Sequence, residues 1–256
     1  PMKGHEPGHL VSAYGDGSHV SPKTWWAALG GYGTWVPRWD IQGESLPHRA
    51  DEDSYGPAIG QIGSSTRHEL MGWIAILTKP TRTMYATDSR AMMTKAKQLI
   101  EKAKYRDECI RRRRKYKEGC PFKKPWGMQT DGDLWQVDWE AVIVRGSCSQ
   151  DVRWVKGHAT NEDIRQGRSS SSDQKGNDRS DTNADKGVEM VAGEGLVTLA
   201  KWAAQRDDGY LKFMAMIHKM IAAVTMAEKD ERDKDKTIEK ACLLYTSDAA
   251  DDSLRV

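Results

Sequence analysis

Short stretches in which apolar and polar residues alternate recur along the chain and predict β-strands. In the first of them, Tyr14 and Asp16 would lie on one face of the strand and Ala13 on the other. The second stretch is aromatic and punctuated by glycine, and it would be reached from the first by a turn. The predicted strands cover residues 9–16, 23–36, 55–62, 83–87 and 152–155.

Apolar residues that recur three and four positions apart predict helices between and after these strands. The first helix begins where Ser65 or Thr66 could cap it and ends before Pro80. The predicted helices cover residues 67–77, 89–114, 134–143, 177–191 and 197–228, and a charged continuation follows at 230–240. The polar stretches 40–53, 119–132 and 161–175 are expected to be loops, the last of them flexible.

The order of these elements predicts an α/β domain with a mixed sheet. Early consecutive strands can pair antiparallel, whereas the later strands must return through helices. We expect the folded domain to cover residues 8–191 and a helical extension to cover 192–241. Residues 242–256 resemble the translation of a sequencing adapter, so we interpret them as an artefact without biological meaning. Because the chain opens on Pro1, we also expect it to be a piece of a longer polyprotein.

Composition says little about function but restricts the environment. The formal net charge is only +2, so overall charge does not indicate a nucleic-acid partner. The four cysteines are widely spaced without a CxxC pair, which argues against a disulfide framework and a zinc cluster and favours a reducing compartment. We therefore expect an intracellular protein, in the cytoplasm or the nucleus. With no run of about 18 apolar residues and no leader sequence, no membrane partner is expected.

Four acidic residues occupy positions that could bring their carboxylates together. Asp16 and Asp88 are each predicted to end a strand, Glu69 lies in the first turn of a helix, and Asp181 lies near the start of a later helix. If the two strands are neighbours, all four side chains can converge on one point. Hard divalent cations such as Mg²⁺ prefer oxygen ligands of this kind. Any one of these acids taken alone could equally be solvated surface, because the chain contains 37 acidic residues.

The sequence around these acids resembles the type 1 ribonuclease H family, found in bacteria and at the C-terminal end of retroelement reverse transcriptases. Seven motifs carry the resemblance, and they occur in the family's order. The long polar insert between KGHA and GN is more similar to a retroelement enzyme than to a compact bacterial one. The motifs are YGDGS at 14–18, GGYG at 30–33, RHELM at 67–71, TDS at 87–89, DLWQ at 133–136, WVKGHA at 154–159 and GNDRSD at 176–181.

The resemblance implies a ribonuclease H-like fold, with a mixed five-stranded sheet flanked by helices and a C-terminal helical extension. It implies endonucleolytic hydrolysis of the RNA strand of RNA–DNA hybrids by two metal ions, Mg²⁺ or alternatively Mn²⁺. The implied metal ligands are Asp16, Glu69, Asp88 and Asp181, and His158 would assist proton transfer or product release. The implied partner besides the hybrid is an N-terminal reverse transcriptase domain of the same retrotransposon polyprotein.

Two of these assignments have alternatives. Asp178 and Asp185 lie close enough in the sequence to compete with Asp181 for the role of fourth ligand. His158 could instead be an ordinary histidine of a surface loop.

The resemblance also points to nucleic-acid contacts. Residues 102–124 are strongly basic where the family has a protrusion that grips the hybrid, although a solvated helix face or a nuclear-import signal would look the same. Ser64 and Ser65 stand where the family often has Thr–Asn, and Arg90 stands where it often has Gln. The expected contacts are Ser18, Ser64, Ser65, Arg90, Arg111, Arg112, Arg113, Arg114, Lys115 and Trp135.

Two other classes of function remain open. A catalytically decayed domain that binds hybrids or serves as a structural part would keep the fold but would normally lose the acids first. Another nuclease or an integrase on the same fold would lack the RHELM and KGHA motifs present here. The Met-rich helix at 211–228 lies beyond the family's minimal domain and is expected to be a packing surface, against the sheet or another part of the polyprotein.

Overall fold

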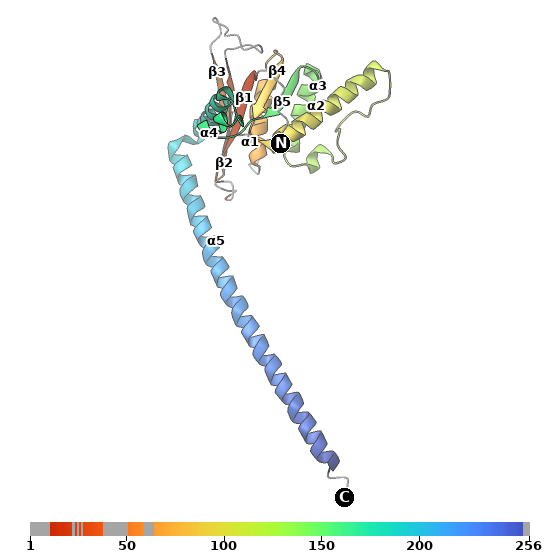
Figure 1. Ribbon diagram of the computed structural model, residues 1–256, viewed down its shortest axis with the longest axis vertical. Coiled ribbons are helices and arrows are strands. Elements are labelled where there is room, and N and C mark those ends of the chain that lie inside the picture. The colour runs from red at the N-terminus through yellow and green to blue at the C-terminus, as the bar shows by residue number, and fades with distance from the viewer. Residues whose placement is uncertain are drawn as a thin grey trace. The chain divides into compact units, whose positions relative to one another are not determined.

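The computed structural model describes residues 11–21, 24, 26, 28–37, 51–58 and 64–252, without the side chains of residues 191 and 244–252. Five strands form one sheet in the order β3-β2-β1-β4-β5 (Figure 1). β1 pairs antiparallel with β2, and β2 pairs antiparallel with β3. β4 lies parallel to both β1 and β5. The strands are β1 (Ala13–Val20), β2 (Leu29–Val36), β3 (Glu52–Pro57), β4 (Thr83–Thr87) and β5 (Gln150–Trp154).

Helices cover this sheet, as the predicted fold class requires. Trp73 of the first helix, Leu99 of the second and Trp139 of the third belong to one buried core cluster with Tyr85 of β4. The start of the last helix approaches β2 closely instead, at Gly31 and Gly33. The mixed five-stranded sheet with flanking helices and a C-terminal helical extension is therefore confirmed. The helices are α1 (Ser65–Leu77), α2 (Arg90–Arg111), η2 (Trp126–Met128), α3 (Gly132–Arg145), α4 (Asn161–Arg165) and α5 (Ser171–Asp252).

The boundaries of several strands differ from the prediction, most of all those of β1 and β3. β1 does not end at Asp16 but continues to Val20, because its ladder with β2 runs on to the pair Val20–Leu29. β3 begins at Glu52, inside the predicted loop 40–53, because Glu52 pairs with the last residue of β2. Residues 9–10, 38–50 and 59–63 lie outside the described part of the chain, so the predictions that fall there are not addressed.

The prediction that residues 161–175 form a flexible loop is wrong. Thr160 and Asp163 form a reciprocal capping box that starts α4, in which each side chain accepts from the other residue's backbone N–H. The hydroxyl of Ser170 accepts from the backbone N–H of Asp173 at 3.0 Å where α5 begins. The cap of α1 is likewise Ser64, which accepts from the N–H of Thr66, and not Ser65 or Thr66. Polar residues here start two helices, and only the short connection 166–170 between them is non-helical.

The close approach of α5 to β2 depends on glycine. A Cβ atom on Gly33 would lie 2.1 Å from the backbone nitrogen of Ala184 and 2.3 Å from the backbone oxygen of Ser180. We expect Gly33→Ala to lower the free energy of unfolding by about 2–3 kcal/mol, since the helix must move away. Urea unfolding measures this.

The control is Gly195→Ala, because a Cβ at that helical position would meet nothing within 4 Å. That variant is expected to be as stable as the unaltered chain or slightly more stable. If Gly33→Ala matched it, the proposed close packing of α5 on the sheet would be contradicted.

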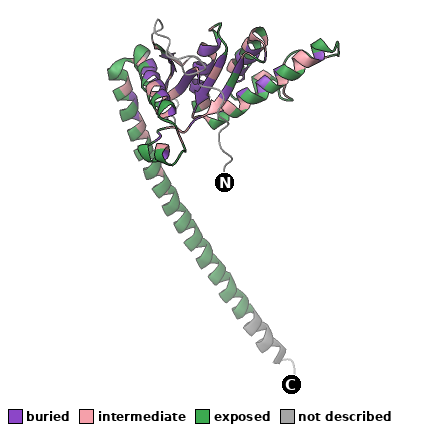
Figure 2. Cartoon of the chain, turned by 45° about the horizontal axis from the view of Figure 1, so that its top comes forward, coloured by how far each residue is buried: buried purple, intermediate pink, exposed green. Residues whose placement is uncertain are grey.

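The chain divides into two compact units, Pro1–Ala204 and Gln205–Val256. The backbone of α5 is non-helical at Gly193, where φ is 65° and ψ is 163°. Beyond the second unit's start the chain is helical to Asp252, and its described side chains are almost all exposed (Figure 2). The helix Ala192–Leu243 is long and apolar enough, by length and composition alone, to cross a membrane. The expectation that the protein has no membrane partner therefore stays a prediction.

Candidate metal centre

Three of the four predicted acidic ligands meet at one edge of the sheet. Asp16 comes from β1, Asp88 follows the neighbouring parallel strand β4, and Glu69 comes from α1. Each offers a carboxylate oxygen, and the three oxygens lie within 4.8 Å of one another. The register explains the meeting of the two aspartates, because Tyr14 of β1 is level with Ala86 of β4, and Asp16 and Asp88 each lie two residues further along the chain. The predicted convergence holds for these three residues.

A glycine lets α1 come close enough to deliver Glu69. A Cβ atom on Gly17 would lie 2.6 Å from the backbone nitrogen of Glu69 and 2.6 Å from the Cβ of His68. The YGDGS motif therefore serves twice, since Asp16 supplies a carboxylate and Gly17 supplies the room for its neighbour.

Asp16 and Glu69 are buried and Asp88 is half-buried, and their carboxylates repel one another. Burial and the charge of Asp88 raise the pKa of Asp16 to about 7, against the hydrogen bond from the Gly17 N–H at 2.7 Å. Burial and the charges of Asp16 and Asp88 raise the pKa of Glu69 well above its ordinary value. The hydroxyl of Thr87 donates to Glu69 Oε2 at 3.2 Å. These hydrogen bonds do not compensate two buried acids and a half-buried one, so the site is suited to a divalent cation.

Asp181 lies near this cluster but does not belong to it by distance. Its pKa is raised by burial and by the charges of Asp185, Asp88 and Asp178, and it is lowered by His158. Its charge also helps raise the pKa of Asp16. Of the competing acids, Asp185 accepts a hydrogen bond from Ser18 Oγ at 2.7 Å. The assignment of Asp181 as fourth ligand stays a prediction.

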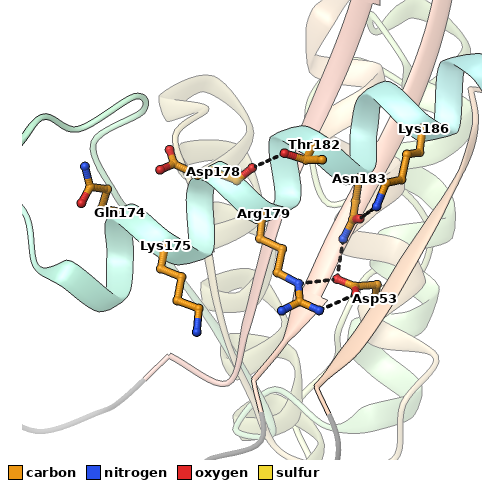
Figure 3. Close-up of a pocket in the computed structure, with 8 residues that line it drawn as sticks. All are labelled: Asp53, Gln174, Lys175, Asp178, Arg179, Thr182, Asn183 and Lys186. Carbon is orange, nitrogen blue, oxygen red and sulfur yellow. Dashed lines mark hydrogen bonds and ion pairs between the residues drawn. The ribbon is translucent and has the colours of Figure 1, made fainter.

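Hydrogen bonds to the sheet hold α5, the helix that carries Asp181 (Figure 3). Arg179 donates to both carboxylate oxygens of Asp53 on β3, at 2.9 and 2.6 Å. Asn183 Nδ2 donates to Asp53 Oδ1 at 2.7 Å and to the backbone oxygen of Thr34 at 3.1 Å. Asp53, Arg179 and Asn183 line a shallow pocket together with Lys175 and other residues of α5. Their hydrogen bonds set the position of α5 across β2 and β3.

His158 lies in the loop after β5, next to the acids. Its side chain is exposed and its backbone is left-handed, with φ of 48°. The preceding Gly157 packs against Asp88, because a Cβ there would lie 2.2 Å from Asp88 Oδ2. The charge of His158 lowers the pKa of both Asp88 and Asp181. The loop therefore brings His158 close to the carboxylates, and its role in catalysis stays a prediction.

Three of the predicted nucleic-acid contacts near the acids take part in local structure. Ser64 caps α1 and Ser65 is its exposed first residue. The guanidinium of Arg90 is exposed and stacks 4.4 Å from the ring centre of Trp154.

The prediction for Trp135 is wrong. Its side chain is only 2% exposed and belongs to the core cluster, with the amine of Lys95 at 4.6 Å from the ring centre. A buried ring cannot stack on a sugar or a base. Trp135 holds α3 against the core instead.

The basic run after α2 divides into two parts. Arg111 and Arg112 both form ion pairs with Glu108 of the same helix. Arg113 and Arg114 follow the end of α2 and are exposed, as is Lys115. All five side chains are exposed, but only Arg111 and Arg112 pair with Glu108, so the second part is the better candidate for binding phosphates.

Two residues of the site were not predicted. Thr87 was interpreted only as the end of a strand, although its hydroxyl holds Glu69. The hydroxyl of Tyr85 is buried with no hydrogen-bond partner among the described residues, and burial and the three acids raise its pKa. The alternation of β4 places Tyr85 and Thr87 on one face, so this signal was available in the sequence.

Magnesium is expected to stabilise the protein. At about 100 times its dissociation constant, a bound ion adds about 2.7 kcal/mol to the free energy of unfolding, which raises the melting temperature by roughly 5–10 °C. Protons compete for Asp16, whose pKa is about 7, so the increase should be larger at pH 8 than at pH 6. Differential scanning calorimetry at matched ionic strength measures it. An equal increase for Asp88→Asn would contradict the assigned ligands.

Comparison with known proteins gives structural similarity only. No protein-family model matches the sequence, and no curated protein is significantly similar to it. The solution structure of the PFV RNase H domain is 17% identical, with 72% of this chain and 96% of that chain covered and a TM-score of 0.46. LC9-RNase H1, a type 1 RNase H with the type 2 active-site motif, is 19% identical, with 77% and 87% covered and a TM-score of 0.40.

A third similar structure is the native Prototype Foamy Virus protease–reverse transcriptase. It is 17% identical, with 73% of this chain and 22% of that chain covered and a TM-score of 0.45. The fold itself rests on the order and pairing of the strands.

Proposed function

We propose that this chain is a metal-dependent endonuclease that hydrolyses the RNA strand of RNA–DNA hybrids. The observation that supports the proposal is the cluster of Asp16, Glu69 and Asp88, whose oxygens lie within 4.8 Å of one another. Placing two buried acids and a half-buried one side by side lowers stability unless a cation compensates them. The cluster lies within the motifs that resemble ribonuclease H, which gives the cation a catalytic purpose.

Each residue of the site has a distinct part in the proposed reaction. Two divalent ions bound there would activate the attacking water and stabilise the leaving 3′ oxygen, which leaves a 5′ phosphate and a 3′ hydroxyl. Asp16, held by the Gly17 N–H, and Glu69, held by Thr87, would keep their oxygens in fixed positions. His158, exposed on its loop, would carry a proton or help release the product.

The preference for a hybrid would come from shape. A duplex that contains RNA has a wide, shallow minor groove in which 2′-hydroxyls can be contacted. Phosphate and sugar contacts carry no base code, so sequence preference is expected to be weak.

Arg113, Arg114 and Lys115 would bind phosphates of the hybrid. Replacing all three by alanine is expected to reduce the slope of log affinity against log salt by about two to three, because each neutralised phosphate contributes about 0.9. Fluorescence anisotropy at several salt concentrations measures the slope. Lys236→Ala with Lys240→Ala, two exposed residues of the second unit, is the control. A slope unchanged by the triple replacement would rule out this grip.

The proposed context is a retroelement polyprotein inside the cell, with a reverse transcriptase domain on the N-terminal side. The support is the sequence resemblance, in particular the long insert between KGHA and GN.

The proposal is tested by measuring binding and cleavage on the same labelled RNA–DNA hybrid. The full chain is expected to cut the RNA strand with Mg²⁺ and to leave it intact with a chelator. Binding without any cleavage in Mg²⁺ or Mn²⁺ would overturn the proposal and favour a decayed hybrid-binding domain.

A further inference from the structure

The helix of the second unit carries a regular apolar stripe, which we call the heptad stripe. Its members recur alternately three and four residues apart. All are exposed except the half-buried Ile217. The charged residues Asp208, Lys212, Lys219 and Lys229 lie together on the opposite face. The heptad stripe consists of Tyr210, Phe213, Ile217, Met220, Val224 and Ala227.

This spacing has a specific meaning. A repeat of 3.5 residues keeps an apolar seam facing one partner helix along its whole length, as in a coiled coil. Phe213 is 52% exposed, Met220 59% and Val224 59%. A row of large apolar side chains, most of them exposed, marks an interaction surface. Met214, Met216 and Ile221 flank the seam and widen it.

Charges at the two ends of the stripe indicate the partner. Arg206 lies four residues before Tyr210, and Glu231 lies four residues after Ala227. Both therefore continue the seam, with a positive charge at one end and a negative charge at the other. A seam of this kind is complementary to itself when it is turned end for end.

We propose that the heptad stripe binds a second copy of this chain in antiparallel orientation. With the pairing centred between Ile217 and Met220, Ile217 faces Met220 of the copy and Phe213 faces its Val224. Arg206 then faces Glu231 of the copy, and the same contact recurs by symmetry at the other end. In a parallel pairing Arg206 would face Arg206 and Glu231 would face Glu231, which disfavours that arrangement.

A lipid bilayer is the competing occupant. Lys212 and Lys219 lie seven residues apart on one face within the apolar segment, and their charges would be costly inside a bilayer. A coiled coil leaves that face in water.

The proposal is tested on the full chain by sedimentation equilibrium. The unaltered chain is expected to be a dimer. Arg206→Glu and Glu231→Arg, made singly, should each raise the dissociation constant about tenfold, since two symmetric contacts become repulsive. The two changes combined should restore it. Lys229→Glu, on the opposite face, is the control and should change little.

Three results would overturn the proposal. The first is a monomer at every concentration measured. The second is a dimer that neither single replacement weakens or that the combined replacement does not restore, which would indicate parallel pairing or another surface. The third is flotation of the chain with neutral phosphatidylcholine vesicles that Ile217→Glu abolishes without changing the mass in solution.

Discussion

Glu69→Gln is expected to abolish cleavage of the hybrid and, at the same time, to make the metal-free protein more stable. The two effects have opposite signs because one carboxylate causes both. Glu69 is 7% exposed, and burial with the charges of Asp16 and Asp88 raises its pKa well above the ordinary value. A group whose pKa is raised on folding stabilises the fold below its unfolded pKa, and this contribution is lost as pH rises towards the folded pKa.

Glutamine has nearly the same shape as glutamate and no charge. Glu69→Gln therefore removes the loss of stability that accompanies ionisation of Glu69. Its amide oxygen can still accept the hydrogen bond from Thr87. We expect a gain of about 2 kcal/mol in the free energy of unfolding at neutral pH without metal. Cleavage should fall on the order of a thousandfold or more, because a metal ligand is lost.

Urea unfolding in chelator and a cleavage assay in Mg²⁺ measure the two effects on the same preparation. Glu189→Gln, at an exposed position of α5, is the control and should change neither. A Glu69→Gln protein that cuts normally would remove Glu69 from the metal site. One that is less stable than the unaltered chain would show that the acids do not repel one another.

Asp138→Asn is expected to change how stability depends on pH without affecting the site. Asp138 is fully buried in α3, and burial raises its pKa to about 7. One carboxylate oxygen accepts from Trp73 Nε1 at 2.9 Å, and the other has no hydrogen-bond partner among the described residues. The neutral acid is therefore favoured in the folded protein.

The direction follows from the raised pKa. Below its ordinary pKa of 3.8, the Asp138 carboxyl does not lower the free energy of unfolding. As pH rises from there to about 7, it lowers that free energy increasingly. The full difference, 7 minus 3.8, is about 3 pKa units, which corresponds to roughly 4 kcal/mol. An asparagine side chain does not titrate, so the variant should gain up to this amount at pH 8 and nothing at pH 4.

The measurement is the difference in unfolding free energy between Asp138→Asn and the unaltered chain from pH 4 to pH 8. Taking the difference cancels the titration of Asp16 and the other site acids. Glu140→Gln, exposed on the same helix, is the control and should show a flat difference. A flat difference for Asp138→Asn would mean that the Asp138 carboxyl is not buried.

The sequence could predict the meeting of Asp16, Glu69 and Asp88 because each belongs to a short motif at the start or end of a predicted element. It could not locate the end of β1. Gly17 and Ser18 have weak strand propensity, and only their pairing with β2 keeps them in the ladder. The pairing of β1 with β2 outweighs the low strand propensity of these two residues.

The errors elsewhere have specific physical causes. Trp135 beside a basic segment looked like a nucleic-acid contact, but helical periodicity alone does not say which face is covered. The serine-rich stretch 161–175 was interpreted by composition, which hides the capping pair Thr160 and Asp163. The contact of Asp185 with Ser18 spans 167 residues, so no local pattern includes it, and the choice of Asp181 over Asp185 stays a prediction.

We propose that the three-carboxylate cluster, with metal bound, cuts an RNA strand only when that strand is paired with DNA. The most direct measurement uses one 5′-labelled RNA strand, alone, paired with DNA or paired with RNA, with the unaltered chain and with Asp88→Asn. In Mg²⁺ we predict that the unaltered chain cuts the RNA–DNA hybrid and neither of the other two substrates, and that its products end in a 3′ hydroxyl. Asp88→Asn should cut none of the three. Equal cleavage of all three substrates, or cleavage by Asp88→Asn at the unaltered rate, would contradict the account.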